Sequence, residues 1–304
     1  MIIAVVGSGA MGSLIGGLLR EAGADVNLYS TNREHVEKIK LNGLVIEGIG
    51  GERTIQINAT TNIEEIGVVD LIIIFVKSYD TRTAADSARK IAGANSSVLT
   101  LQNGIGNVET LESLYGKERV LAGTTDAAAT IVSPGRVKHT AGGNVYIGSL
   151  NGEITFRVKE IVALFREAGF NAHATDNAIG MIWTKLILNL AINPPGTILR
   201  VICRGLVDND YARALMKEII NEALQIAEKR GIQLLYADMV QAAYDLAEKN
   251  ADSQNSMLQD FLKGKRTEID FISGAIVREG KQIGIDAPVN RTMNDLVKAL
   301  TLRG

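Results

Sequence analysis

The feature that most constrains the fold is a glycine-rich loop near the start of the chain. A β-branched run, Ile2–Val6, is typical of a strand buried on both faces, and Gly7-Ser8-Gly9-Ala10-Met11-Gly12 follows it directly. A helical pattern from residue 11 to about residue 21 comes next, and a second strand pattern covers Asp25–Tyr29. Strand, glycine loop, helix and strand in this order predict a βαβ unit.

Each glycine of this loop has a physical reason in a dinucleotide-binding unit. Gly7 permits the tight turn, Gly9 lets the backbone approach a pyrophosphate, and Gly12 lets the helix pack against the strand. The N–H groups and positive dipole end of the helix then face the phosphates. A structural turn without a nucleotide is the alternative, but the strand–loop–helix context favours a dinucleotide site.

The residues after the second strand bear on which dinucleotide is bound. NAD enzymes usually carry an acidic residue there for the ribose 2′-hydroxyl, whereas this chain has Ser30, Thr31, Asn32 and Arg33. Such donors suit a 2′-phosphate, so NADP(H) is favoured, with NAD(H) or a merely solvated loop as alternatives. Lys77, directly after the strand pattern at 71–76, is a second candidate phosphate or ribose contact, or simply a solvated strand end.

The rest of the chain indicates two domains, as its 304 residues also suggest. Strand patterns at 71–76, 98–101 and 120–123 alternate with helical patterns, and a hairpin at 45–57 and antiparallel strands at 125–148 complete the first half. From residue 154 onward, long helical patterns dominate. We therefore predict an α/β chain with a Rossmann-type doubly wound sheet domain over residues 1–168 and an all-helical domain over 169–304.

Composition argues against several classes of function. Lys plus Arg number 32 and Asp plus Glu 34, so the net charge of −2 offers no basic excess for nucleic acid. The single cysteine, Cys203, and three scattered histidines predict neither a disulfide nor a metal site. Five glycines interrupt the uncharged first 19 residues and no basic segment precedes them, so we expect no signal peptide or membrane span and a cytoplasmic protein.

A lone lysine marks the helical half. Lys185 is the only charged residue between positions 177 and 199, and Asn189 and Asn193 follow it at i+4 and i+8, on the same helical face. We expect this apolar helix to be buried and to stop at Pro194-Pro195. A partly desolvated lysine has its pKa pushed down, which suits a proton donor; a snorkelling lysine with two capping asparagines is the alternative.

Two further segments are candidates. The loop at residues 102–106 carries Asn103 and follows a buried strand, where such a sheet meets its ligand, although a simple Asn-Gly turn would look the same. Glu268 lies in a helix start with Thr267 as the expected N-cap. There the dipole favours the ionised carboxylate, whether or not it serves a site.

Together these motifs resemble the ketopantoate reductase (2-dehydropantoate 2-reductase) family. The glycine loop, the Asn103 loop, Trp183-Thr-Lys185 with Asn189 and Asn193-Pro, and Ser256-Met-Leu-Gln-Asp260 with Thr267-Glu268-Ile-Asp270 occur in the family's order over nearly the whole chain. The last two pieces are quite specific, whereas the glycine loop alone is not.

The resemblance implies NADPH-dependent reduction of ketopantoate to (R)-pantoate, a step toward pantothenate and coenzyme A. It implies that Lys185 is the general acid, that Asn103 lies beside the nicotinamide, and that Glu268 lies near the cofactor ribose and the lysine. It further implies cofactor contacts from the glycine loop, Lys77 and Ala129, and substrate contacts from Asn189, Asn193, Ser253 and Ser256.

The chain departs from the family pattern at two places. Thr31 stands near the position where an arginine often binds the 2′-phosphate, and the arginine here is Arg33. Arg204 stands where a substrate-contacting asparagine is expected; it could pair with the substrate carboxylate, or the contact is lost, and Cys203 beside it is a plain thiol.

Two other functions stay open. One is a reductase of another 2-keto or 3-keto acid on the same scaffold, and the other is an NADP(H)-binding sensor without catalysis. In each case the expected partner is a small molecule. A homodimer through the helical domain is compatible with the sequence, in which nothing shows the pairing face.

Overall fold

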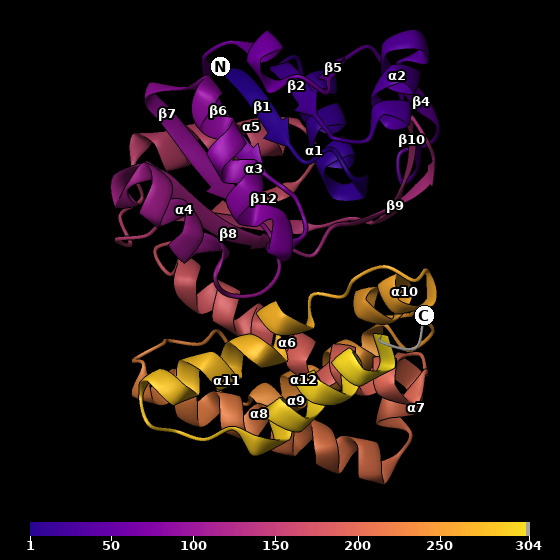
Figure 1. Ribbon diagram of the computed structural model, residues 1–304, viewed down its shortest axis with the longest axis vertical. Helices are drawn as coiled ribbons and strands as arrows, with labels where there is room; N and C mark the ends of the chain where they lie inside the picture. Colours follow the sequence, from indigo (N-terminus) through magenta and orange to yellow (C-terminus); the bar gives the residue numbers. More distant parts are fainter. Residues whose placement is uncertain (302–304) are drawn as a thin grey trace. The chain divides into compact units, whose positions relative to one another are not determined.

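The computed structural model describes residues 1–301 and divides into two compact units (Figure 1). The first contains residues 1–102 and 107–178, and the second contains residues 103–106 and the chain from residue 179 onward. This division lies later than the expected boundary at residue 168, because β12 (Asn171–Ala174) pairs with β11 (Asn144–Ser149) in the first unit's sheet.

The first unit is built on an eight-stranded sheet, and the predicted α/β class is confirmed. All neighbouring strands are parallel except β8 and β11, which are antiparallel. The strand order, from one edge to the other, is β12, β11, β8 (Val120–Thr125), β7 (Ala92–Thr100), β6 (Val69–Ile74), β1 (Ile2–Val6), β2 (Asp25–Tyr29) and β5 (Asn58–Thr60).

A second, four-stranded sheet contains the glycine-rich hairpin that the sequence predicts. β3 (Leu44–Gly48) and β4 (Arg53–Ile55) pair antiparallel across it. β10 (Arg136–Ala141) pairs in parallel with β3 and antiparallel with β9 (Ala128–Ser133), so the expected turn at Ser133-Pro134-Gly135 is also confirmed.

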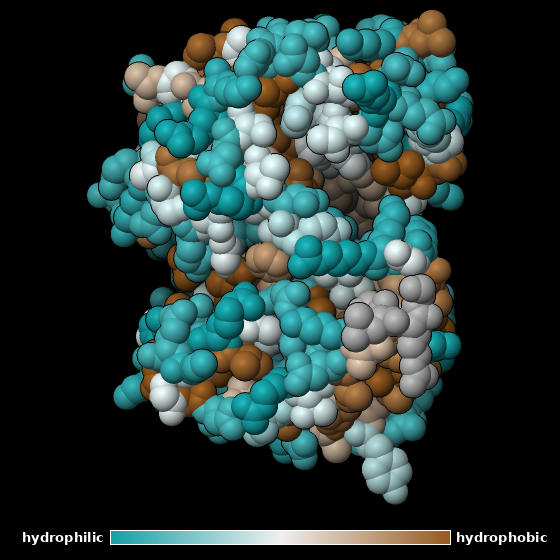
Figure 2. Space-filling view, in the orientation of Figure 1, coloured by the Kyte–Doolittle hydropathy of each residue, from teal (hydrophilic) through white to brown (hydrophobic). Residues whose placement is uncertain are grey.

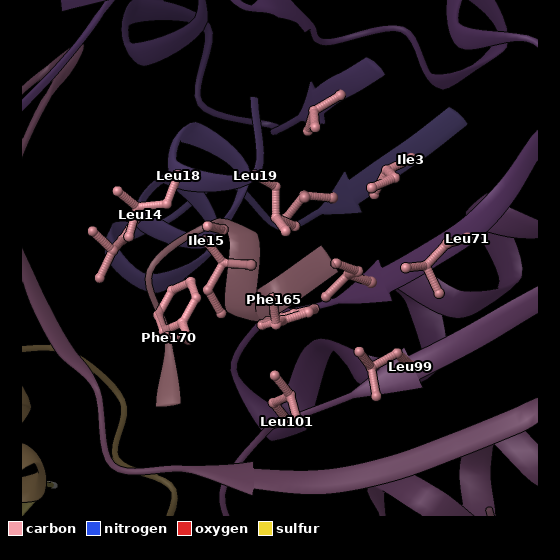
Figure 3. Close-up of a cluster of buried hydrophobic side chains, with 14 of the residues drawn as sticks. Ile3, Leu14, Ile15, Leu18, Leu19, Leu71, Leu99, Leu101, Phe165 and Phe170 are labelled. Carbon is pink, nitrogen blue, oxygen red and sulfur yellow. The ribbon is translucent and has the colours of Figure 1, made fainter. Parts of the chain in front are cut away.

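The first unit has five α-helices. The first of them, α1, forms because its apolar residues recur at helical spacing. Leu14, Ile15, Leu18 and Leu19 are buried in one core together with Phe165 of α5 (Figure 3). Burying each such side chain contributes about 1.5–3 kcal/mol. The helices are α1 (Ala10–Glu21), α2 (Arg33–Asn42), α3 (Thr81–Ala88), α4 (Asn107–Tyr115) and α5 (Phe156–Glu167), with short 3-10 helices η1 (Ile63–Ile66), η2 (Ser78–Asp80), η3 (Arg89–Ile91) and η4 (Lys117–Arg119).

The second unit is helical, as predicted, and has its own core around Trp183. Side-chain caps from Asn209, Asp238 and Asn255 start three of its helices. Its elements are α6 (Ala178–Leu199), α7 (Cys203–Val207), α8 (Asp210–Lys229), α9 (Met239–Lys249), α10 (Ser256–Leu262), η5 (Ile269–Phe271), α11 (Ser273–Gln282) and α12 (Pro288–Thr301).

Three predictions about these helices are wrong. α6 does not stop at Pro194-Pro195 but continues through both prolines to Leu199. Residues 190–197 are all buried, so tertiary packing outweighs the two backbone hydrogen bonds that the prolines remove. The expected helix from Glu268 is instead the short η5, separated from α11 by Ile272, and Thr267 makes no cap because Glu268 holds the N-cap position.

Hydrophilic residues cover most of the visible face of each unit, with apolar residues in small groups between them (Figure 2). None of the helices among residues 1–301 has the length and apolar character that a bilayer span requires.

Candidate functional site

The glycine loop is held against the ends of the strands on both sides of it. The backbone N–H groups of Gly7 and Ser8 both donate to the carbonyl oxygen of Tyr29, at 3.0 Å each, which ties the loop to the end of β2. Gly7 has φ +104°, and a Cβ there would lie 2.8 Å from the carbonyl carbon of Phe75. The loop therefore joins the carboxyl ends of β1, β2 and β6, as the sequence predicts for a ligand site.

The other two loop glycines differ in what surrounds them. A Cβ on Gly12 would lie 2.1 Å from the Gly7 carbonyl oxygen, so only glycine fits there. A Cβ on Gly9 would meet no heavy atom within 4 Å. Gly9 is the N-cap of α1, which has no side-chain cap and no acidic residue in its first turn. The loop thus leaves the positive end of α1 open to an anion.

Two side chains of the segment after β2 accept hydrogen bonds from nearby backbone N–H groups. Asn32 caps α2, because its Oδ1 accepts from the backbone N–H of His35 at 3.1 Å, and the Asn32 N–H donates to Ser30 Oγ at 3.2 Å. Thr31 and Arg33 are exposed. The Ser30 hydroxyl and the Asn32 amide nitrogen are not the donors in either of these bonds, so neither bond removes them from the four predicted side-chain donors.

Lys77 and Ala129 lie on segments next to the glycine loop. Lys77 is the N-cap of η2, two residues after Phe75, and the side chain of Gln102 fixes the same turn by donating to the Val76 carbonyl oxygen at 2.7 Å. Ala129 lies in β9, which packs against α1. Lys77 thus follows a strand end that contacts the glycine loop, and Ala129 lies on a strand that packs against α1.

In the second unit, α6 presents the predicted polar face. Lys185 and Asn189 are half-buried, and Asn193 is 4% exposed. The three positions follow one another at intervals of one turn along the same helix. An ammonium group and two amides therefore line one face of a helix whose other residues are uncharged and mostly apolar.

The Asn103 loop belongs to this same unit, which the sequence did not reveal. The N–H of Ile105 donates to the Phe271 carbonyl oxygen at 3.2 Å, and Ile105 packs in the core that contains Trp183 and Leu186. Gly104 has φ +83°, and a Cβ there would lie 2.5 Å from the same carbonyl oxygen. The structure therefore docks the loop that carries Asn103 on η5, whose N-cap is Glu268, and packs its Ile105 against α6.

The segment that carries Ser253 and Ser256 packs against the end of α6. The N–H groups of Cys203 and Arg204 donate to the carbonyl oxygens of Ser253 and Ala251, at 3.1 and 2.8 Å. A Cβ on Gly196 would lie 2.5 Å from Nδ2 of Asn255, the cap of α10. Both serines are thus held beside the part of α6 that follows Asn193.

Arg204 already has a protein partner. Its Nη2 lies 2.9 Å from Asp252 Oδ1, and both side chains are largely exposed. The hydrogen bond with Asp252 is the main cause of the raised pKa of Arg204. Cys203 is 4% exposed, and burial raises the pKa of its thiol, as in an unreactive structural cysteine.

The charged groups around η5 form a network beside Glu268. Asp270 accepts from Lys298 in a short ion pair, and Arg266 Nη2 lies 3.8 Å from the same carboxylate. Both pairs thus converge on Asp270, two residues after Glu268. Within residues 1–301, no group of three or more His, Cys, Asp or Glu side chains is arranged to hold a metal ion.

Comparison with known proteins matches both units to the same protein family. The family model described as ketopantoate reductase PanE/ApbA matches residues 3–152, and the one for the ketopantoate reductase PanE/ApbA C terminal matches residues 177–301. A 2-dehydropantoate 2-reductase of Pyrococcus horikoshii is 41% identical over 299 residues, covering 98% of this chain and 97% of that protein.

Two solved structures are similar over the full chain. One is a PanE/ApbA family ketopantoate reductase from Ralstonia eutropha JMP134, with a TM-score of 0.93, 33% identity, and coverage of 100% of this chain and 99% of that one. The other is a ternary structure of D-mandelate dehydrogenase with NADH and anilino(oxo)acetate, with a TM-score of 0.94, 31% identity, and coverage of 99% and 98%.

Proposed function

Because the chain belongs to the ketopantoate reductase family, and is on that ground an oxidoreductase that uses a nicotinamide cofactor, we propose that it reduces ketopantoate to (R)-pantoate with NADPH. This reaction is a step toward pantothenate and coenzyme A. The observation that carries the proposal is the α6 face of Lys185, Asn189 and Asn193, next to the Asn103 loop docked on the Glu268 segment.

The first unit has the features that a dinucleotide needs. The open space at Gly9 and the uncapped start of α1 fit a pyrophosphate, which would accept from the N–H groups of residues 9–12. Arg33 and Thr31 would bind the 2′-phosphate, and Lys77 and the backbone of Ala129 would contact the rest of the cofactor. When bound, the nicotinamide supplies the hydride.

Lys185 supplies the proton in this proposal. Its ammonium group would hydrogen-bond the keto oxygen of the substrate, donate a proton to it, and stabilise the developing alkoxide. The apolar surroundings on α6 strengthen that electrostatic effect, since less water screens it. Asn103 would orient the lysine or the substrate, and Glu268 would contact Lys185 and the cofactor ribose.

The remaining polar groups would hold the substrate. Asn189, Asn193, Ser253 and Ser256 offer amides and hydroxyls that can bond a carboxylate and a hydroxyl group. Fixed in this way, a 2-keto acid keeps one orientation toward the proton donor. Arg204 would join them only by exchanging its present partner, Asp252.

The test is a matched pair of lysine variants. Lys185→Ala is expected to lower kcat at least about 100-fold, because the general acid is lost, while the Kd for NADPH stays near the wild-type value. Lys229→Ala, which removes an exposed lysine at the end of α8, should keep full activity. Full turnover by Lys185→Ala would exclude the role assigned to this residue.

A second candidate is an NADH-dependent reductase of another 2-keto acid. It is favoured by the similarity to D-mandelate dehydrogenase, whose structure holds NADH, and by Thr31 near the place of a phosphate-binding arginine. A panel of 2-keto and 3-keto acids with each cofactor separates the two candidates, because the proposal requires the highest kcat/KM for ketopantoate.

A further inference from the structure

A buried chain of hydrogen bonds lies beneath the glycine loop, at a residue that neither the motif nor the proposed mechanism uses. His35 of α2 is 1% exposed, and its Nε2 lies 3.0 Å from Ser13 Oγ of α1. Ser13 Oγ donates to the carbonyl oxygen of Ser8, also at 3.0 Å. On the other side of the ring, the backbone N–H of Gly135 donates to Nδ1 at 3.0 Å.

These contacts determine the protonation of the ring. The N–H of Gly135 can only donate, so Nδ1 must carry no proton. The Ser13 hydroxyl gives its single proton to Ser8, so its oxygen accepts from His35 and the ring proton is on Nε2. The imidazole is therefore neutral, and burial lowers the pKa of His35, which favours the same form.

These hydrogen bonds connect three segments that we propose to bind or border the cofactor. Ser8 lies inside the glycine loop, and α2 begins directly after the Thr31–Arg33 segment, where the N–H of His35 also bonds the Asn32 cap. Gly135 lies in the turn between β9, which carries Ala129, and β10. The imidazole of His35 thus connects the glycine loop, the Thr31–Arg33 segment and the β9–β10 hairpin.

We propose that His35 is a positioning residue for the dinucleotide: in its neutral form it fixes, through Ser13, the carbonyl of Ser8 and with it the N–H groups at the start of α1. The inference rests on the proposed cofactor site. A second proton on the ring would set two donors, Nδ1–H and the Gly135 N–H, against each other and break the connection. Lowering the pH should therefore weaken dinucleotide binding, because it protonates His35.

Charges on the neighbouring elements do not account for the state of the ring. Burial is the cause of its lowered pKa. The segment of α1 from Ala10 to Leu19 has no charged residue. The charged residues of α2 are Arg33, Glu34, Glu37, Lys38 and Lys40. Those of β10 are Lys138 and Arg136, and Arg136 is paired with Glu47 and Glu52.

Nuclear magnetic resonance can measure the pKa of the His35 ring with and without the cofactor. If His35 had only a structural role, cofactor binding would not lower this pKa. The chain has three histidines, so protein labelled with ¹⁵N-histidine gives three ring systems, and His35→Gln assigns that of His35. A ligand that prefers the neutral ring must lower its pKa, by about one for a tenfold preference. A nearby pyrophosphate acting only through its negative charge would raise it. We expect a proton on Nε2 and a fall in the His35 pKa on cofactor binding; a rise or no change would overturn the proposal.

Two serine variants test the same connection through the affinity for the cofactor. Ser13→Ala removes the bridging hydroxyl and should raise the Kd for the cofactor about fivefold to tenfold, the effect of one lost buried hydrogen bond. Ser87→Ala is the control, since Ser87 Oγ also donates to a backbone carbonyl, that of Thr83 at 3.0 Å, but in an exposed hydrogen bond on α3. Equal Kd values for the two variants would overturn the proposal, even if His35→Gln did not fold.

The outcome for His35 can be told apart from that for the cofactor assignment. The wild-type protein is first titrated with NADPH and NADH, and the tighter ligand is used throughout. Tighter binding of NADH would refute the proposed NADPH preference but would leave the test of His35 unchanged. Binding of neither would overturn both, whereas a rise in the His35 pKa on binding would overturn only the inference about His35.

Discussion

Gly9 allows the dinucleotide site to be tested without disturbing the fold. Its backbone angles, φ −70° and ψ −158°, are open to any residue, and a Cβ there would meet no heavy atom within 4 Å. Gly9→Ala should therefore fold normally. It should even gain about 0.4–1 kcal/mol of stability, because alanine restricts the unfolded chain.

The same methyl group would stand where the pyrophosphate must approach α1. A hydrogen bond between a backbone N–H and a charged group contributes about 1.5–3 kcal/mol. If the methyl group prevents one such bond, the Kd for the cofactor rises about 10- to 100-fold. We therefore predict a variant that is at least as stable as the wild type but binds the dinucleotide poorly.

The assay compares Gly9→Ala with Gly142→Ala by cofactor titration and thermal unfolding. Gly142 is a matched control, because it also lacks a positive φ and a Cβ there would meet only Ile49 Cδ1, at 3.9 Å. Gly142→Ala should bind the cofactor like the wild type. Unchanged affinity in Gly9→Ala would refute the reasoning, since the open space at Gly9 would then not be where the cofactor lies.

Two further predictions concern stability and its dependence on pH. Gly104→Ala should lower the free energy of unfolding by at least about 1–2 kcal/mol, because alanine is strained at φ +83°. It should also displace the Phe271 carbonyl, so we expect a lower Tm and a lower kcat. A variant with wild-type Tm would show that the Asn103 loop is not fixed there. Tyr115 donates to the Ala85 carbonyl oxygen at 2.6 Å, and burial raises its pKa from 10.0 to about 12. Its stabilising contribution should thus be complete below about pH 10 and be lost toward pH 12, so the difference in urea-unfolding free energy between wild type and Tyr115→Phe should shrink over this range; a constant difference would contradict the assignment.

The parts of the fold that the sequence predicted are those set by local patterns. The β-branched run before the glycine loop gave β1 and the start of α1, because strand and loop are adjacent in the chain. The hairpin at residues 45–57 followed from its glycine-rich turn. The helical character of the second unit followed from long apolar periodicity, and all of these are confirmed.

Features that depend on tertiary contacts could not be predicted in this way. The prolines of α6 argue for a helix end, and only the burial of the surrounding residues explains why the helix continues. The Asn103 loop follows a strand of the first unit, yet its bond to Phe271 places it in the second. His35 and Gly135 are 100 residues apart, and no local pattern links them. The roles of Lys185 and its neighbours stay predictions.

The most direct test of the account is to mix the purified protein with ketopantoate and follow the absorbance of reduced nicotinamide, first with NADPH and then with NADH. We predict ketopantoate-dependent loss of the signal, faster with NADPH than with NADH at equal concentrations. Binding of NADPH without any consumption on adding ketopantoate would contradict the central claim, because a dinucleotide site would be present but the proposed reaction would not.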